Sequence, residues 1–138
     1  MRIVAGQYKR RQLLYPKDTP ELRPTKDMVK EAVFSIVQGK IPGCRFLDLC
    51  AGVGSIGLEA LSRGAQDVVF IDRNPFYIHK NAEALGCKER VRIYKQDALR
   101  AIDILSKNKE QFDVIYIDPP YALPVAQDSL NKPQLIDI

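Results

Sequence analysis

The sequence predicts an α/β domain built as a Rossmann-like parallel sheet with flanking helices. Three observations support that prediction. From residue 45 onward, short apolar runs alternate with amphipathic stretches in the order β-α-β-α-β-α-β. The apolar runs are rich in β-branched and aromatic residues, as is typical of strands covered by helices on both faces. A glycine-rich turn joins the first run to the stretch that follows it, as in the first turn of many doubly wound sheets.

The expected strands span about residues 46–50, 67–71, 90–94 and 112–117. Gly64 and Gly86 each follow a helical stretch where a left-handed residue is favoured, so they mark helix ends. Pro75 suits the first turn of the helix between the second and third strands. A length of 138 residues with 46% hydrophobic and 28% charged residues indicates one compact domain.

Two further elements are expected ahead of the sheet. The stretch TKDMVKEAVFSIVQGK has apolar residues at helical spacing, which predicts a helix with one buried face that Gly39 ends. That face would consist of Met28, Val29, Ala32, Val33, Ile36 and Val37. Earlier in the chain, RIVAG and RQLLYP are predicted to pair as a small N-terminal β-hairpin.

Positive charge is concentrated in the N-terminal third of the chain. The net charge is +4, but residues 1–45 hold ten lysines and arginines against four acids, a net of +6. Lys9, Arg10 and Arg11 form the densest cluster. Such asymmetry indicates an arm that contacts phosphate groups, and the alternative is a basic hairpin that is merely solvated.

Cysteine spacing and hydropathy exclude several classes of protein. Cys44, Cys50 and Cys87 are odd in number and lack CxxC spacing, which argues against a disulfide framework and a zinc site, so we expect reduced thiols and no metal. No apolar run approaches the roughly 20 residues of a membrane span. The N-terminus MRIVAGQYKRR lacks the apolar core of a signal peptide. We therefore expect a cytoplasmic protein with no membrane partner.

The glycine-rich turn has the spacing of a cofactor-binding loop. Gly52, Gly54 and Gly57 match G-x-G-x-x-G between a strand and a helix, where the backbone and the helix N-terminus are open to a ligand. Asp72 closes the next strand twenty residues after Gly52, where an acid can accept both hydroxyls of an adenosine ribose. The alternative is a purely structural strand-to-helix turn.

Two further acids are candidates for the cofactor site, and the first of them favours S-adenosylmethionine over a dinucleotide. Asp48 lies inside the first strand, and an acid there suits a sulfonium and ammonium ligand better than a pyrophosphate, which it would repel. Asp97, in Gln96-Asp97-Ala98, ends the third strand, where its carboxylate could accept the adenine amino group. The alternative for Asp97 is an ordinary helix N-cap. All these residues are expected to gather at one crevice, since the carboxyl ends of parallel strands share an edge.

The fourth strand runs directly into Asp118-Pro119-Pro120-Tyr121. Two consecutive prolines stop the strand and fix the backbone, which suits an exocyclic amine on a nucleic-acid base. The Asp118 carboxylate and the Pro119 carbonyl can accept the two amine hydrogens, while Tyr121 stacks on the base. The alternative is a rigid turn with a capping aspartate.

Taken in order, several segments resemble the bacterial rRNA guanine-N2 methyltransferases that modify guanine 966 of 16S rRNA. The resemblance covers residues 1 to about 122 and is carried by RIVAGQYKRRQL, LRPTKDMVKEAVFSIV, LDLCAGVGSIGLEALSRGA, Asp72-Arg73 and IDPPY. It implies an S-adenosylmethionine-dependent enzyme that transfers a methyl group to the N2 amine of a guanine in 16S rRNA. Its partner would be the 30S subunit or an assembly intermediate of that subunit.

The resemblance also implies roles for individual residues. The cofactor site would comprise Arg23, Thr25, Asp48, Ala51, Gly52, Gly54, Gly57, Asp72, Arg73, Asp97 and Ala98, with Arg23 and Thr25 closing over the methionine end. The catalytic set that holds the guanine would be Asp118, Pro119, Pro120 and Tyr121. The residues expected to contact RNA are Arg2, Lys9, Arg10 and Arg11.

These expectations divide the chain into a basic arm, residues 1–22, and a methyltransferase domain, residues 23–138. Members of the resembled family continue with further strands, so we expect a domain that lacks its C-terminal strands and leaves the last strand as a sheet edge. Two alternatives stay open: a DNA adenine-N6 methyltransferase, and a non-catalytic module that binds RNA or cofactor. The single histidine, His79, is expected on the surface rather than as a base. The oligomeric state is left open.

Overall fold

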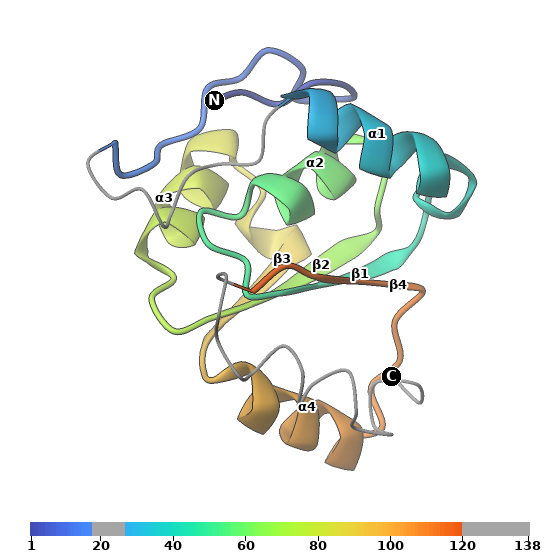
Figure 1. The fold of residues 1–138 in the computed structure, drawn as a ribbon, viewed down its shortest axis with the longest axis vertical. Helices are drawn as coiled ribbons and strands as arrows, with labels where there is room; N and C mark the ends of the chain where they lie inside the picture. The colour runs from blue at the N-terminus through green and yellow to red at the C-terminus, as the bar shows by residue number, and fades with distance from the viewer. Residues whose placement is uncertain (18–26, 120–138) are drawn as a thin grey trace.

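The computed structural model describes residues 1–17 and 27–119, and its centre is a parallel four-stranded sheet (Figure 1). The strands are β1 (Arg45–Leu49), β2 (Asp67–Asp72), β3 (Val91–Lys95) and β4 (Val114–Ile117), in the spatial order β3-β2-β1-β4. Every described strand pair is parallel, because a helix returns the chain after each strand. The predicted α/β class is confirmed.

Helices cover both faces of this sheet. On one face lie α1 (Asp27–Val37), α2 (Ser55–Ser62) and α3 (Phe76–Leu85), and on the other lies α4 (Ala98–Lys107) (Figure 1). Two short 3-10 turns, η2 (Gln38–Lys40) and η3 (Lys88–Arg90), follow α1 and α3. The molecule therefore has three layers, with the sheet in the middle.

The predicted strand bounds differ from the observed ones by at most two residues, and one of these differences has a clear local cause. β1 ends at Leu49 because Cys50 has a φ of 57°, which no strand residue adopts. Pro75 precedes α3 as its N-cap and is not in the first turn, and its carbonyl accepts a hydrogen bond from the His79 N–H at 3.0 Å. Gly86, with a φ of 68°, ends α3 as predicted.

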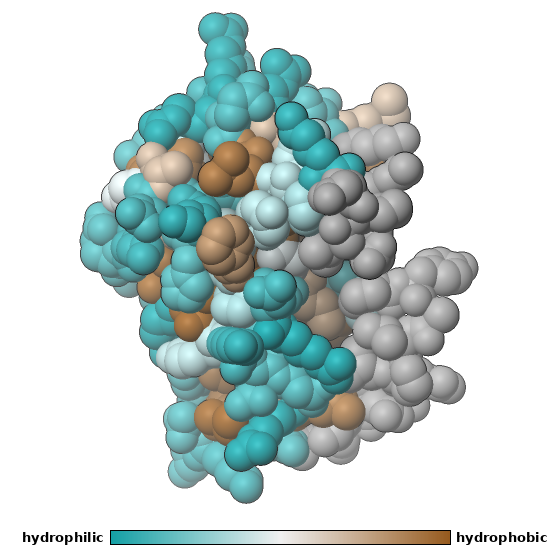
Figure 2. Space-filling model, turned by 90° about the vertical axis from the view of Figure 1, so that its left-hand side faces the viewer, coloured by the Kyte–Doolittle hydropathy of each residue, from teal (hydrophilic) through white to brown (hydrophobic). Residues whose placement is uncertain are grey.

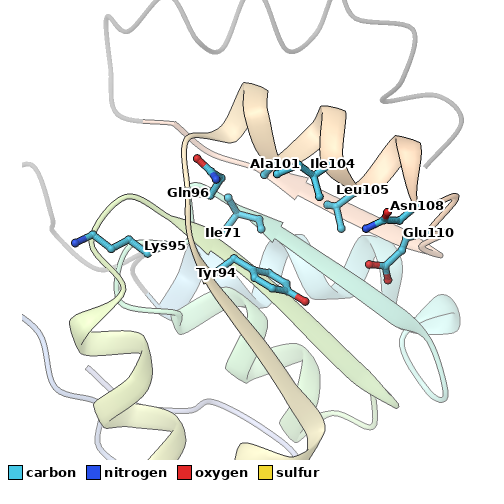
Figure 3. Close-up of a pocket in the computed structure, with 9 residues that line it drawn as sticks. All are labelled: Ile71, Tyr94, Lys95, Gln96, Ala101, Ile104, Leu105, Asn108 and Glu110. Carbon is cyan, nitrogen blue, oxygen red and sulfur yellow. The ribbon is translucent and has the colours of Figure 1, made fainter.

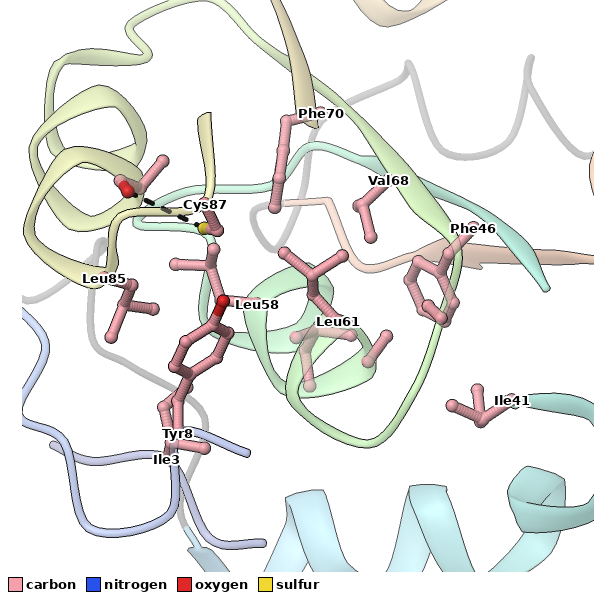
Figure 4. Close-up of a cluster of buried hydrophobic side chains, with 14 of the residues drawn as sticks. Ile3, Tyr8, Ile41, Phe46, Leu58, Leu61, Val68, Phe70, Leu85 and Cys87 are labelled. Carbon is pink, nitrogen blue, oxygen red and sulfur yellow. Dashed lines mark hydrogen bonds between the residues drawn. The ribbon is translucent and has the colours of Figure 1, made fainter. Parts of the chain in front are cut away.

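Alternation along the strands divides the core into two clusters. Phe46, Val68 and Phe70 face α2 and α3, whereas Leu47, Val69 and their neighbours face α4. Figure 4 shows the larger cluster, in which Ile3 and Tyr8 of the N-terminal arm point toward Leu58 and Leu61 of α2. The arm is therefore part of the main core.

The buried face of α1 differs from the prediction. Lys30 and Phe34 are its buried residues, whereas Met28 is 79% exposed and Ile36 is 84% exposed. Lys30 is buried because its Nζ lies 3.4 Å from Oε1 of the equally buried Glu59 on α2 and donates to the Arg2 carbonyl at 2.7 Å. Burial lowers the pKa of Lys30, and the charge of Glu59 opposes that effect. An ion pair with a distant residue thus overrides the apolar periodicity.

The N-terminal segments pair antiparallel, as predicted, but only through an isolated bridge between Arg2 and Gln12, with no regular strand. Five hydrogen bonds join this arm to α2, more than to any other helix. The N–H groups of Val4 and Ala5 donate to the two Glu59 oxygens at 2.9 and 3.0 Å, and the Tyr8 N–H donates to Ser62 Oγ at 2.9 Å. Whether residues 1–22 form a separate unit stays a prediction.

Among residues 1–17 and 27–119, no helix has the length and apolar character needed to span a membrane. On the face drawn in Figure 2, hydrophilic residues predominate and the hydrophobic ones are scattered.

Candidate cofactor and substrate site

The glycine-rich loop turns sharply between β1 and α2. Gly52 and Gly54 have φ values of 62° and 86°, a region that favours glycine, and the Gly54 N–H donates to the Ala51 carbonyl at 2.9 Å. Ala51 is tied to the sheet through its N–H, which donates to the Ile71 carbonyl at 3.0 Å. A Cβ added to Gly52 would meet no atom within 4 Å. The loop is thus anchored at its start and open above Gly52.

Gly57, the third glycine of the motif, has a different role from the first two. It lies in α2 and is buried, and a Cβ added there would lie 2.3 Å from Phe70 Cε1. Gly57 therefore allows α2 to pack closely on β2. Its N–H donates to Oδ2 of Asp48 at 3.0 Å, which connects the helix start to an acid inside β1.

Asp72 ends β2 and holds the loop through both of its carboxylate oxygens. Oδ2 accepts a hydrogen bond from the Gly52 N–H at 2.7 Å, and Oδ1 accepts one from the Asn74 N–H at 2.8 Å. Each carboxylate oxygen has a further lone pair, so these bonds leave acceptor capacity for a ligand. The proposed contact with ribose stays a prediction.

Asp48 is 2% exposed and lies in the register of β1 beside Tyr116 of β4. Burial raises the pKa of Asp48 to about 8, against the effect of the Gly57 N–H, and the charges of Asp72 and Asp118 add to the rise. A carboxyl group in this state is neutral near pH 7 unless a cation approaches it.

Asp97 caps α4, which is the alternative that the sequence left open. Its Oδ2 accepts a hydrogen bond from the Arg100 N–H at 3.2 Å, and its Oδ1 accepts one from Arg73 Nη2 at 2.7 Å. The Arg73 guanidinium is the largest influence that lowers the pKa of Asp97. Ala98 is buried beside it as the first residue of α4. Capping does not test a contact with adenine, which stays a prediction.

Asp118 is exposed and Pro119 is half-buried directly after β4, at the same edge of the sheet. Pro120 and Tyr121, predicted to complete the base site, lie outside the described residues, as do Arg23 and Thr25, predicted for the cofactor site.

The predicted acids converge on a residue that the sequence analysis did not place in the site. Cys50, between β1 and the loop, is half-buried, and burial raises the pKa of its thiol to about 11. Further contributions come, in order of size, from the charges of Asp72, Asp48, Asp118 and Asp97. These acids follow or lie within four different strands, and the fold brings all of them around one thiol.

Tyr116 is a second residue that the sequence analysis missed. It shares a face of the sheet with Asp48, and burial together with the charges of Asp118 and Asp48 raises its pKa to about 12. Its strand position two residues before Asp118 was the signal in the sequence, since alternate residues of a strand face the same side.

A separate hollow of about 200 Å³ flanks the site on the α4 side of the sheet (Figure 3). Tyr94, Ile104 and Leu105 contribute apolar surface, and Gln96 and Glu110 line it near opposite ends of α4 (Figure 3). It does not include the glycine-rich loop.

The basic residues of the arm differ in whether they have partners within the protein. Lys9 and Arg10 are exposed in the turn of the arm, where Arg10 has a φ of 73°. Arg11 donates to the Ala84 carbonyl at 2.7 Å, and Arg2 pairs with Asp27 at 3.1 Å. Contact with RNA stays a prediction for all four.

Within residues 1–17 and 27–119, no group of three or more His, Cys, Asp or Glu side chains could hold a metal ion. Cys44, Cys50 and Cys87 are free thiols. His79 is exposed on α3, as predicted.

The fold and this edge of acids define a methyltransferase of the Rossmann-like class. Among solved structures, the chain is similar to "Putative methyltransferase yhhF from Escherichia coli", with a TM-score of 0.80 and 30% identity over 95% of this chain and 71% of that one. The chain belongs to the family described as "Conserved hypothetical protein 95", which matches residues 1–134.

Two curated relatives are named for ribosomal RNA. "Putative rRNA methyltransferase YlbH" of Bacillus subtilis is 39% identical over 88% of this chain and 67% of its own length. "Ribosomal RNA small subunit methyltransferase D" of Haemophilus influenzae is 35% identical over 95% of this chain and 69% of its own length. The chain therefore spans about two thirds of the length of these relatives.

Proposed function

We propose that this chain transfers a methyl group from S-adenosylmethionine to the exocyclic N2 amine of a guanine in 16S rRNA, within the 30S subunit or its assembly intermediate. One observation carries the proposal. Asp48 lies within β1, Asp72 ends β2, and Asp97 and Asp118 follow β3 and β4, so the four acids lie around Cys50 at the carboxyl edge of the sheet. Arg73 is the single cation paired with any of them among the described residues. An edge with this charge favours a cationic ligand.

The described residues fit S-adenosylmethionine. This cofactor supplies an electrophilic methyl group on a positively charged sulfur, and it also carries an ammonium group. The space beside Gly52 is open, which gives room for a ligand next to the loop. Asp72, which accepts a hydrogen bond from the Gly52 N–H, keeps further acceptor capacity there. Asp48 is buried near the start of α2 and accepts one hydrogen bond, from the Gly57 N–H. Asp97 and Ala98 would border the adenine end, beside Arg73.

The residues after β4 would act on the target amine. The Asp118 carboxylate and the Pro119 carbonyl accept its two hydrogens, which turns the nitrogen lone pair toward the methyl carbon. As the N–C bond forms, the S–C bond breaks and its electron pair stays on sulfur. The amine then loses one proton to Asp118 or to water. Neither a covalent intermediate nor a metal ion is required.

Two features favour ribosomal RNA as the substrate. Both curated relatives carry rRNA in their names, and one of them names the small subunit. The exposed Lys9 and Arg10 provide positive charge for phosphate groups. A guanine in a loop is a suitable target, because unstacking it costs least there.

Mass mapping of methylated nucleotides tests this function. Unmodified 30S subunits and duplex DNA are each incubated with the protein and labelled S-adenosylmethionine, and the nucleotides are then digested and identified. We expect N2-methylguanine at one position of 16S rRNA. N6-methyladenine in DNA would overturn the proposal, as would cofactor binding with no transfer to either substrate.

Asp118→Ala gives the matching test of the site. We expect loss of transfer with cofactor affinity nearly unchanged, because the carboxylate contacts the amine rather than the cofactor. Asp113→Asn, at the opposite end of the same strand, serves as the control and should retain transfer. Activity of Asp118→Ala equal to that of the unmodified chain would exclude this role.

A further inference from the structure

Asp48 has one hydrogen-bond partner and no neighbouring cation among the residues that the structure describes. It is 2% exposed, and Oδ2 accepts a single hydrogen bond, from the Gly57 N–H at 3.0 Å. The charged groups that act on it are Asp72, at the end of β2, and Asp118, after β4, and both are acids. A buried carboxylate with such neighbours is strongly disfavoured.

The other groups that face Asp48 do not relieve this imbalance. Tyr116 lies beside it in the register of β4, and Phe70 lies beside it in the register of β2. Cys50, two residues on, is a thiol whose own pKa is raised by the same acids. Burial raises the pKa of Asp48 to about 8, which favours the protonated form at neutral pH.

We propose that Asp48 distinguishes the positively charged methyl donor from the product, whose sulfur is uncharged, by releasing its proton only when the cation is bound. This inference rests on the proposed function, and it adds a reason why the product leaves the site. When the donor binds, the Asp48 O–H bond would break, the proton would pass to solvent, and the carboxylate would balance the positive charge of the sulfonium. After transfer the sulfur is neutral, and Asp48 takes a proton back from solvent.

Proton linkage gives this inference a quantitative form. If donor binding releases one proton, the donor dissociation constant falls up to about tenfold for each pH unit between about pH 6 and 8, and then levels off. The dissociation constant of the product should not change with pH through Asp48, because the product sulfur is uncharged. The amino groups of both ligands also titrate near this range, so the difference in proton release between donor and product, rather than either value alone, reports on Asp48.

Titration calorimetry at pH 7 counts the protons directly. Each ligand is titrated in two buffers of different ionisation enthalpy, and the difference in heat gives the protons released. The ligands are S-adenosylmethionine, S-adenosylhomocysteine and sinefungin, which carries an ammonium group in place of the sulfonium. We expect close to one more proton for each of the two cations than for the thioether.

Asp48→Asn keeps an oxygen acceptor for the Gly57 N–H but cannot titrate. It should lose the extra proton and lower the ratio of donor affinity to product affinity about fivefold or more, with little change for the product. Asp67→Asn, at the amino end of β2 and far from the crevice, is the matched control and should preserve both.

The outcomes separate the two proposals. Equal proton release for cations and thioether, or an unchanged affinity ratio in Asp48→Asn, would overturn this inference. If Asp48→Asn does not fold, the proton counts of the unmodified protein alone decide. Failure of the unmodified protein to bind any of the three ligands would instead overturn the proposed function.

Discussion

Glu59 and Asp48 are both fully buried carboxyl groups on the same side of the sheet, but they have opposite surroundings. Glu59 accepts hydrogen bonds from the N–H groups of Val4 and Ala5 and from Arg63 Nε, and its Oε1 lies 3.4 Å from Lys30 Nζ. Asp48 accepts one hydrogen bond, from the Gly57 N–H, and its charged neighbours are acids.

This difference separates a structural acid from a functional one. Burial of a charge is tolerated when donors and a countercharge compensate it, as they do around Glu59, where the acid joins the arm, α1 and α2. A buried acid without compensation is destabilising, and such groups are concentrated at functional sites. Substitution of the two acids should therefore change the free energy of unfolding in opposite directions.

Glu59→Gln should have the largest effect. It removes the ion-pair partner of the buried Lys30, so we expect a loss of about 3–5 kcal/mol in the free energy of unfolding. Urea unfolding followed by circular dichroism measures it. Asp27→Asn, which breaks the exposed pair with Arg2, should cost only about 0–1 kcal/mol. A loss below about 1 kcal/mol for Glu59→Gln would mean that Glu59 does not stabilise the arm.

Asp48→Asn should raise the free energy of unfolding, whereas Glu59→Gln lowers it. The pKa of Asp48 is raised in the folded state, to about 8, so its contribution to stability is complete below about pH 4 and is lost progressively up to pH 8. Asparagine removes this loss, so the variant should gain on the order of 2 kcal/mol at pH 9 over the unmodified chain. Urea midpoints without cofactor at pH 5, 7 and 9 should show a widening gap, and a gap that is constant with pH would refute the assignment.

Asp97→Ala should have a smaller effect than either buried acid. Asp97 caps α4, and removing an N-cap typically costs about 1 kcal/mol. Its pair with Arg73 is exposed and adds little. Thermal unfolding measures the change, and Asp97→Asn, which retains a capping side chain, should restore most of it. A loss comparable to that of Glu59→Gln would show that Asp97 is more than a cap.

Lys9→Ala with Arg10→Ala should have the smallest effect on stability, within about 0.5 kcal/mol, because both side chains are exposed. Arg11 is left in place, since it bonds to the Ala84 carbonyl. If the two residues contact rRNA phosphates, affinity for the 30S subunit falls and its dependence on salt becomes flatter, at unchanged cofactor affinity. Binding measured at several salt concentrations decides this, and identical slopes would leave the arm as a solvated segment.

Local patterns predicted most of the fold but not the face of α1. Apolar periodicity placed Met28 and Ile36 in the core, yet the structure buries Lys30 there. Lysine is expected at the surface unless a buried partner compensates its charge. The partner, Glu59, is 29 residues away in the sequence, and nothing local connects the two.

The positions of the acids along the fold were predicted better than the buried face of α1, for a physical reason. The alternation of strands and helices along the chain, the glycine-rich loop and the acids at the strand ends follow from residue spacing. Parallel strands then bring their carboxyl ends to one edge. That reasoning placed Asp48, Asp72 and Asp97 together, and the structure brings Asp118 to the same edge. It could not assign the packing role of Gly57, the positions of Cys50 and Tyr116, or the proton on Asp48. Those properties depend on burial and on distances between residues far apart in the chain, and only the folded structure sets them.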